Sequence, residues 1–330
     1  DVRPYKNGTN SKNLTHDIAF VIADLGCGGA QRVLTTLANA LAKRQRRICV
    51  ITLATPEGDF FTLDPGITRI AIGGISRSGS ITGSIAANLR RLFLLRRAFR
   101  KAQPDAIVAF IASTNVLAII AAAGLNTQVV ISERNDPRLQ SHGRAWNMLC
   151  RLLYRRADLV TANSHGALAA LSAFVPDAKL FFAPNPIQDP GAAAAISPQS
   201  NGGEPKFLIV GRLNHQKAHD VLLDAFAQSL KAIPTWRLSI VGGGKLETIL
   251  KQQANRLGIS DRVDWVGEAK DPFAYYADAA CFLLPSRFEG TPNALLEAMG
   301  CGLPAIVSDA SPGPLEYVED GVTGLVVPVD

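Results

Sequence analysis

Short β-rich runs alternate with helical patterns along nearly the whole chain, and this alternation constrains the fold more than any other feature of the sequence. The β-rich runs span residues 17–23, 48–53, 105–110, 128–132 and 159–162, and then 206–210, 237–241, 262–266, 280–284 and 305–308. Helical patterns fill the intervals, for example from Ala30 to Lys43 and from Ala218 to Leu230. This alternation predicts an α/β fold in which helices cover both faces of parallel sheets.

The alternation is interrupted between Pro184 and Pro205, where the chain reads PNPIQDPGAAAAISPQSNGGEP. Proline and glycine are frequent there and apolar anchors are few, which is typical of a boundary between domains. A chain of 330 residues is also longer than a single core usually organises. We therefore predict two domains, residues 1–188 and residues 189–330.

Composition narrows the class of protein. The chain is 47% hydrophobic and 19% charged, which is ordinary for a globular protein. The longest apolar run, residues 116–125, is about half of a membrane span, and the polar N-terminus lacks the apolar core of a secretory signal. The five cysteines are scattered without a CxxC pair, which argues against a disulfide framework and a zinc ribbon. We expect a cytoplasmic protein.

The net charge of +6 is unevenly distributed. Residues 1–190 carry 23 Lys and Arg against 12 Asp and Glu, whereas residues 191–330 carry 11 against 16, so we expect the first half to face an anionic partner. Six cations between Arg90 and Lys101 alternate with apolar residues on a predicted helix. This pattern fits either docking on anionic lipid headgroups or a solvated basic face. Aromatic residues spaced for base stacking are missing, which argues against nucleic acid.

The most specific motif is FEGTPNALLEAMGCGLP, residues 288–304. Thr291 is a good N-cap and the next residue is a proline, so we expect a helix to begin there. The free backbone N–H groups near Asn293 and Ala294 would then form an anion site. Glu289 precedes this helix and Glu297 lies within it, where carboxylates could accept hydrogen bonds from hydroxyl groups. The alternative is an ordinary capped helix with two surface carboxylates.

A second motif, GRLNHQK, spans residues 211–217 after a buried strand. Arg212 and Lys217 would be aimed at a diphosphate from the end of that strand, and Gly211 would let the backbone approach closely. Two solvated surface cations are the alternative. His215 and His219 resemble a zinc pair only in their spacing, because the HExxH glutamate and a third ligand are missing.

Several glycines and one polar loop also follow predicted strands. Residues 242–244 are three glycines that could form a phosphate-binding nest or a tight corner. Gly267 precedes Glu268 in a segment that could be part of a base pocket or a plain loop. The Gly-rich turn at residues 26–32 fails the GxGxxG fingerprint, because residue 31 is glutamine. The loop at residues 132–137 places Glu133 and Arg134 where they could line a cleft or pair with each other.

Taken together, four motifs resemble one enzyme family. They are GGAQR at residues 28–32, GRLNHQK at residues 211–217, VGGG at residues 241–244 and the E-x7-E pair at residues 289 and 297. The chain resembles retaining glycosyltransferase family 4, also called glycosyltransferase group 1, over about residues 17–329. It is especially similar to bacterial members that extend lipid-linked or exported polysaccharides, in which GGAQR occurs with a SERN-type loop. The resemblance implies the GT-B fold, in which two Rossmann-like domains face each other across a cleft.

The resemblance also implies roles for individual residues. Arg212 and Lys217 would hold the donor diphosphate, and Glu289 would bind hydroxyls of the donor sugar, so these three form the expected catalytic set. The expected donor-binding residues are Gly29, Gly211, Gly243, Gly267, Gly290, Thr291, Asn293, Ala294 and Glu297, the last of them on the ribose. The expected acceptor-side residues are Gly28, Arg32, Glu133 and Arg134.

The activity implied by this family is transfer of a hexose or N-acetylhexosamine from a nucleotide sugar, with a UDP-sugar favoured, to a lipid-linked or polysaccharide acceptor. It would need neither a metal nor a cofactor, and it would proceed by front-face displacement at the inner face of the plasma membrane. Family members continue beyond the GVTGLVVP segment with helices that cross back to the first domain, so the second domain is expected to be truncated. The alternatives are a nucleotide-sugar epimerase, a nicotinamide oxidoreductase and a non-catalytic binding module.

Overall fold

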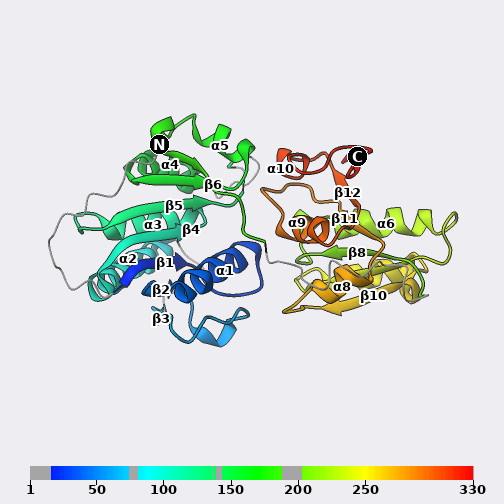
Figure 1. Cartoon of the computed structure of the whole chain (residues 1–330), viewed down its shortest axis with the longest axis horizontal. Helices are drawn as coiled ribbons and strands as arrows, with labels where there is room; N and C mark the ends of the chain where they lie inside the picture. Colours follow the sequence, from blue (N-terminus) through cyan, green and yellow to red (C-terminus); the bar gives the residue numbers. More distant parts are fainter. Residues whose placement is uncertain (1–15, 74–80, 136, 139–142, 188–202, 330) are drawn as a thin grey trace.

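The computed structural model describes residues 16–73, 81–135, 137–138, 143–187 and 203–329. These residues form two parallel sheets, one of seven strands and one of six, which lie side by side (Figure 1). The first sheet ends at Phe182 and the second begins at Lys206. The boundary predicted between residues 188 and 189 lies at the edge of a stretch outside the described residues, and each sheet stays on its own side of it.

The first sheet has the strand order β3-β2-β1-β4-β5-β6-β7, and every pairing in it is parallel. Its strands are β1 (His16–Ile22), β2 (Ile48–Thr52), β3 (Thr68–Ala71), β4 (Pro104–Phe110), β5 (Gln128–Glu133), β6 (Leu159–Ala162) and β7 (Leu180–Phe182). In register, Phe20 pairs with Val50 on one side and Val21 pairs with Ala109 on the other.

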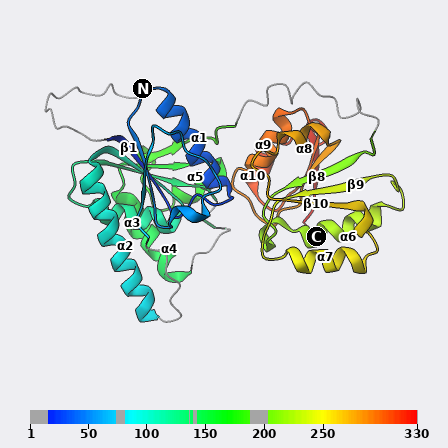
Figure 2. The same cartoon turned by 90° about the horizontal axis from the view of Figure 1, so that it is seen from below.

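Helices cover both faces of this sheet. They are α1 (Gly29–Lys43), α2 (Ile81–Ala102), α3 (Ala112–Ala122), α4 (Arg144–Leu153) and α5 (His165–Leu171). Helices α2, α3 and α4 lie on one face and α1 lies on the other (Figure 2). Alternation along β1 explains this, because Val21 points into the core beneath α2 and α3 whereas Phe20 and Ile22 point into the core beneath α1.

The second sheet repeats the plan with the order β10-β9-β8-β11-β12-β13, again all parallel. Its strands are β8 (Lys206–Val210), β9 (Arg237–Val241), β10 (Val263–Gly267), β11 (Cys281–Leu284), β12 (Ala305–Ser308) and β13 (Gly324–Val327). Its helices are α6 (His219–Ser229), α7 (Glu247–Arg256), α8 (Phe273–Asp278), α9 (Asn293–Gly300) and α10 (Pro312–Leu315). Helices α6 and α7 cover one face, and α8 and α9 cover the other (Figure 2).

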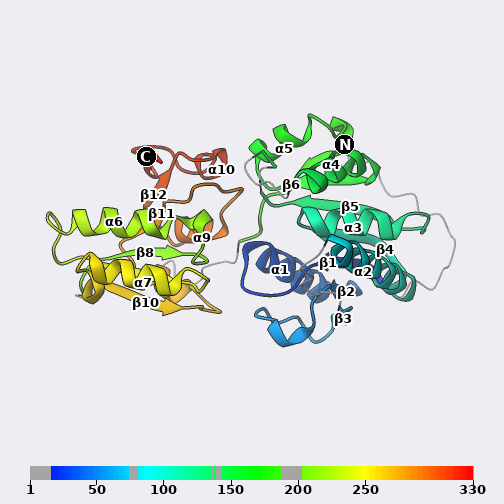
Figure 3. The same ribbon diagram turned by 180° about the vertical axis from the view of Figure 1, so that it is seen from behind.

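In each sheet the strand order reverses direction once, between β1 and β4 and between β8 and β11. Open parallel sheets bind ligands beyond the carboxyl ends of their strands at such a reversal, because the flanking loops diverge there and leave a crevice. The loop after β1 leads into α1, and the loop after β8 carries the 3₁₀ turn His215–Lys217. In Figure 3, α1 and α9 are found at the facing sides of the two domains. Loops from both domains line one cavity at the boundary between them.

The two-domain parallel α/β fold predicted from the sequence is confirmed, and some local predictions were wrong. Strands β3, β7 and β13 were missed, because they are short strands at or near sheet edges whose side chains are partly exposed. The helix predicted to begin at Pro292 begins at Asn293, and Thr291 does not cap it. The predicted basic helix is the C-terminal part of α2. None of the helices in the described ranges is long and apolar enough to cross a membrane.

Candidate active site between the domains

A cavity of about 390 Å³ lies between the two sheets, walled by loops from both. Thirteen of the sixteen residues singled out in the sequence line it. They are Gly28, Gly29, Arg32, Arg134, Gly211, Arg212, Lys217, Gly243, Glu289, Thr291, Asn293, Ala294 and Glu297. The cavity therefore joins motifs that are far apart in the chain.

The cationic side of the cavity follows β8. Lys217 Nζ lies 2.6 Å from Glu289 Oε1, and the side chain of Gln216 donates to the backbone oxygen of Phe288 at 3.0 Å. Arg212 is exposed, and its side chain makes no hydrogen bond or ion pair with any residue that the structure describes. A guanidinium without a protein counter-charge, beside an ammonium that still has donors to spare, can bind an anionic group in the cavity.

The opposite wall begins at the N-terminus of α9. Pro292 occupies the N-cap position and contributes no side-chain hydrogen bond, so the first N–H groups of α9 have no capping side chain. The Thr291 hydroxyl donates instead to the backbone oxygen of Asn163 in the first domain. This tertiary contact explains why the predicted cap was wrong. Asn293 Nδ2 donates to Gly29 O at 3.1 Å, which brings the start of α1 against the start of α9.

Glu297 is buried in the cavity wall and holds two partners. Its Oε1 lies 3.0 Å from Arg32 Nε in the first domain, and its Oε2 accepts a hydrogen bond from the Tyr276 hydroxyl at 3.0 Å. Burial raises the pKa of the Glu297 carboxyl, and the Arg32 guanidinium opposes that rise. Arg32, expected on the acceptor side, thus reaches into the second domain and pairs with the expected ribose ligand.

Glycines let the second-domain backbone pack tightly behind the cavity. A Cβ on Gly242, whose φ is +142°, would lie 2.0 Å from the backbone oxygen of Gly211. A Cβ on Gly244 would lie 2.5 Å from the backbone oxygen of Leu213. The sequence left open whether these glycines form a phosphate-binding nest or a tight corner, and the packing requires the tight corner. Gly243, in the middle of this corner, also lines the cavity.

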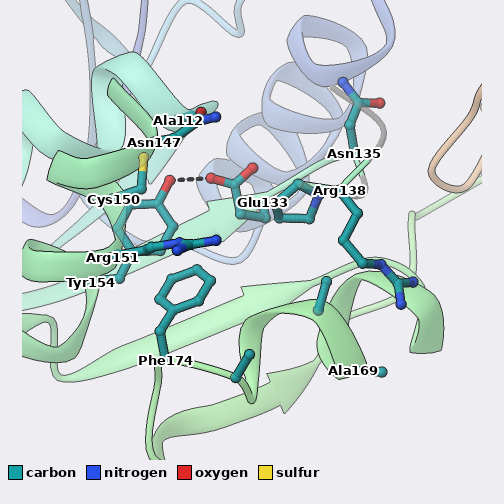
Figure 4. A pocket seen from close by; sticks show the side chains of 13 residues that line it. Ala112, Glu133, Asn135, Arg138, Asn147, Cys150, Arg151, Tyr154, Ala169 and Phe174 are labelled. Carbon is teal, nitrogen blue, oxygen red and sulfur yellow. Dashed lines mark hydrogen bonds between the residues drawn. The ribbon is translucent and has the colours of Figure 1, made fainter. Parts of the chain in front are cut away.

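Three of the sixteen residues lie outside this cavity. Gly267 stands behind the wall, where its carbonyl accepts a hydrogen bond from Gly242 N at 2.8 Å. Gly290 packs against the backbone of the first domain, because a Cβ there would be 2.5 Å from the backbone oxygen of Arg134. Glu133 lines a separate cavity within the first domain (Figure 4). The sequence left open whether Glu133 and Arg134 line a cleft or pair with each other. Arg134 does line the interdomain cavity, and it is stacked over Phe110 with its guanidinium carbon 5.3 Å from the ring centre.

Sequence reasoning missed four residues that organise this site. Asn185 Nδ2 donates to Asn293 Oδ1 at 2.5 Å and to Thr291 O at 3.0 Å, and Asn163 supports it from the end of β6. Gln216 lies within the recognised GRLNHQK motif, and Tyr276 comes from α8. A polar residue directly after a strand was a usable signal for Asn163, whereas nothing local marks Tyr276. Among the described residues, no group of three or more His, Cys, Asp or Glu is arranged to hold a metal ion.

Comparisons with known proteins agree with this geometry. The family profile described as "Glycosyl transferases group 1" matches residues 194–330, and the profile "Glycosyl transferase 4-like domain" matches residues 28–186. The chain is 30% identical, over 315 residues, to the GalNAc-alpha-(1->4)-GalNAc-alpha-(1->3)-diNAcBac-PP-undecaprenol alpha-1,4-N-acetyl-D-galactosaminyltransferase of Campylobacter jejuni, covering 95% of this chain and 85% of that protein.

Two further similarities point the same way. A second Campylobacter jejuni enzyme is N-acetylgalactosamine-N,N'-diacetylbacillosaminyl-diphospho-undecaprenol 4-alpha-N-acetylgalactosaminyltransferase. It is 27% identical to this chain over 327 residues, which cover 95% of this chain and 86% of that enzyme. The structure of Anabaena HepE, solved in complex with UDP, superposes with a TM-score of 0.71 at 23% identity, covering 94% of this chain and 85% of HepE. The chain therefore belongs to the group 1 glycosyltransferases and has the GT-B fold that its sequence predicted.

Proposed function

We propose that this protein transfers an N-acetylhexosamine or hexose, with retention of configuration and without a metal, from a UDP-sugar to a lipid-linked or polysaccharide acceptor. One observation carries the proposal. Arg212 and Lys217 come from one segment of the second domain and Glu289 and Glu297 from another, and all four converge on one cavity that the first domain closes. Cations and hydroxyl-binding carboxylates in one small cavity match the two halves of a nucleotide sugar.

The donor diphosphate would lie against Arg212 and Lys217, near the N–H groups that begin α9. Lys217 has three donors, so it can contact a phosphate while keeping its ion pair with Glu289. Glu289 would then accept hydrogen bonds from the sugar, and Glu297 from the ribose. The UDP bound by HepE and the N-acetylgalactosamine named for the Campylobacter relatives support the choice of donor.

In the proposed reaction, an acceptor hydroxyl attacks the anomeric carbon from the face that the nucleotide leaves. The new bond joins the acceptor oxygen to that carbon, the bond from the carbon to the β-phosphate oxygen breaks, and the hydroxyl proton passes to the departing diphosphate. The charge that develops on the diphosphate is stabilised by Arg212, Lys217 and the α9 N-terminus. Such fixed charges need little reorganisation during the reaction.

The acceptor would approach from the first domain and from a membrane surface. On α2, Ile85, Leu89 and Phe93 are each more than half exposed and are spaced four residues apart, so they form one apolar stripe. Arg90 and Arg97 are exposed beside it. An apolar stripe flanked by cations favours docking on anionic lipid over a merely solvated face. The lipid-linked substrates named for the Campylobacter relatives support a peripheral position at the inner face of the plasma membrane.

The donor assignment is tested by substitution of Arg212. We expect Arg212→Ala to lower kcat/KM by roughly a hundredfold, about 3 kcal/mol, as for the loss of one donor that stabilises developing charge. Transfer of radiolabelled sugar to a membrane extract measures the activity, after a thermal-shift panel of UDP-, GDP- and ADP-sugars has selected the donor. Lys245→Ala removes an exposed cation that does not line the cavity and should leave kcat/KM unchanged. Near wild-type turnover by Arg212→Ala would refute the assignment, and donor binding without turnover by the wild type would indicate a binding module.

A further inference from the structure

A pair of adjacent phenylalanines, Phe60 and Phe61, lines the interdomain cavity and has no role in the site described above. The pair belongs to the loop after β2, in the first domain. Both side chains are half-buried, and neither belongs to a hydrophobic core formed by the described residues. Apolar side chains that border a cavity carrying charged groups are typical of a surface that a ligand covers.

The loop holds the Phe60–Phe61 pair in a fixed place. On one side of the pair, Asp59 Oδ2 forms an ion pair with Nη2 of Arg69 on β3 at 2.9 Å. The backbone N–H of Phe60 donates to the backbone oxygen of Leu25 at 2.8 Å. On the other side, the amide of Asn39 on α1 donates to a backbone oxygen at 3.2 Å and accepts from a backbone N–H at 2.8 Å. Groups that are already fixed before binding lose little conformational entropy when a ligand arrives.

The two rings of the pair are arranged edge to face. Their centroids are 5.1 Å apart and their planes are inclined by 84°. In this geometry the positive edge of one ring packs against the negative face of the other, which stabilises the position of both. A flat ligand can lie parallel to only one of two perpendicular rings, while the other ring supports it from the side. The Phe60–Phe61 pair therefore offers one rigid, flat surface to a ligand.

One end of the interdomain cavity is formed around Glu289. Next to it, a Cβ on Gly290 would be 2.5 Å from the backbone oxygen of Arg134, and the Thr291 hydroxyl donates to the backbone oxygen of Asn163. These two first-domain residues directly follow β5 and β6. Because Glu289 is proposed to bind the donor sugar, transfer to the acceptor takes place at this end.

The other end of the cavity is formed by the first-domain segments after β1 and β2. Arg32 Nε, from α1, lies 3.0 Å from Glu297 Oε1. Burial and the nearby Glu268 carboxylate both raise the pKa of the Cys27 thiol, so the turn after β1 lies near the loop after β10. Strand β2 neighbours β1 on the side away from β4 and β5, and Figures 1 and 3 show it on the same side of the molecule as β10. The Phe60–Phe61 pair therefore shares this end with the loop after β10.

The parts of a nucleotide sugar follow each other in the order sugar, diphosphate, ribose and base. In the proposed site Glu289 binds the sugar and Glu297 binds the ribose, so the base lies beyond Glu297. There the hydroxyl of Tyr276, on the helix that follows the loop after β10, donates to Glu297 Oε2 at 3.0 Å. The base consequently reaches the end of the cavity that the Phe60–Phe61 pair lines. An acceptor hydroxyl must instead approach the anomeric carbon to about 3–3.5 Å, at the Glu289 end.

We infer that the Phe60–Phe61 pair is a stacking surface for the nucleobase of the donor, contributed by the first domain. This inference rests on the proposed function and adds a determinant of donor binding to it. Every nucleobase has a π-face that can stack on an aromatic ring. The base contacts the loop after β10 in the second domain and a phenyl ring of the first domain, so the bound nucleotide bridges the two domains.

The inference is tested by removing the rings and, separately, the aromatic character of the base. The variant is the double substitution Phe60→Ala and Phe61→Ala. The matched control is Phe181→Ala on β7, because Phe181 is 53% exposed and does not line the cavity. Isothermal titration calorimetry measures the binding of UDP, of dihydro-UDP, whose saturated base is no longer flat, and of inorganic pyrophosphate, which has no base. Circular dichroism checks the fold of each variant.

We expect the double variant to bind UDP about tenfold more weakly than the wild type does, which corresponds to about 1.4 kcal/mol and is within the range of base stacking on an aromatic residue. Its affinity for pyrophosphate should be unchanged. The wild type should bind UDP about tenfold more tightly than dihydro-UDP, whereas the double variant should bind these two nucleotides equally. Phe181→Ala should bind all three ligands as the wild type does.

Three results would overturn the inference. They are an unchanged UDP affinity in the double variant, an equal loss of affinity for UDP and pyrophosphate, and a wild type that binds UDP and dihydro-UDP equally. The first result, combined with impaired sugar transfer to a membrane extract, would assign the pair to the acceptor instead. Failure of the proposed function is distinguishable, because the wild type would then bind UDP without transferring sugar from any UDP-sugar. No UDP binding by the wild type would overturn both.

Discussion

Replacing Glu133 by glutamine should stabilise the protein at alkaline pH. The pKa of this carboxyl rises from its usual 4.5 to about 7 in the folded protein because it is buried at the end of β5, beside Tyr154 and Asn115. The folded state therefore binds a proton more tightly than the unfolded state, and the wild type loses stability as pH rises from about 4.5 through 7. Each pKa unit corresponds to about 1.4 kcal/mol, so the full penalty above that window is about 3 kcal/mol.

Glutamine removes this penalty and keeps an acceptor oxygen for Tyr154 and Asn115. We expect Glu133→Gln to raise the free energy of unfolding by about 3 kcal/mol at pH 8.5 and by less than half of that at pH 5.5. Urea denaturation of the wild type and the variant at both pH values measures the difference. Stabilisation accompanied by a loss of acceptor binding would show that function maintains the carboxyl.

A matched control is Glu247→Gln on α7. Glu247 is an exposed carboxyl in an i, i+4 ion pair with Lys251, so its replacement should change the stability by less than 1 kcal/mol at either pH. The reasoning about Glu133 would be refuted if the stability difference between Glu133→Gln and the wild type were the same at pH 5.5 and pH 8.5.

Two further substitutions probe the interdomain cavity. Gly242→Ala forces a Cβ toward the backbone oxygen of Gly211, so it should lower the free energy of unfolding, measured in urea, by about 2 kcal/mol or more. The control is Gly258→Ala, because Gly258 has a positive φ but no close neighbour, and this substitution should lower the free energy of unfolding by about 1 kcal/mol. Equal losses would contradict the close-packing argument. Arg32→Gln removes the cation that opposes the rise in the Glu297 pKa, so UDP affinity should fall more steeply than in the wild type as the pH is lowered and this carboxyl becomes protonated. Isothermal titration calorimetry measures this, and superimposable pH profiles would argue against a role for Glu297 in binding UDP.

The sequence by itself determined the class of fold and many of the polar residues and glycines that line the interdomain cavity. Its β-rich runs have apolar residues on both faces, because helices cover both faces of the parallel sheets. Polar and glycine residues follow these strands directly, and the carboxyl ends of parallel strands share one edge of a sheet. Local patterns therefore located Arg212, Lys217 and Glu289 correctly within one cavity.

Only the tertiary structure decided which residues face each other across the domains. Arg32 and Glu297 are 265 positions apart, and their ion pair depends on how α1 and α9 meet. Thr291 is a residue type that often caps helices, yet its hydroxyl donates a hydrogen bond to a backbone oxygen of the first domain. Short edge strands such as β3 and β7 carry no long apolar run, because one side of an edge strand is unpaired and partly solvated. Glu133 and Arg134 are neighbours in sequence, but successive side chains leave a strand end in different directions, so they line two different cavities.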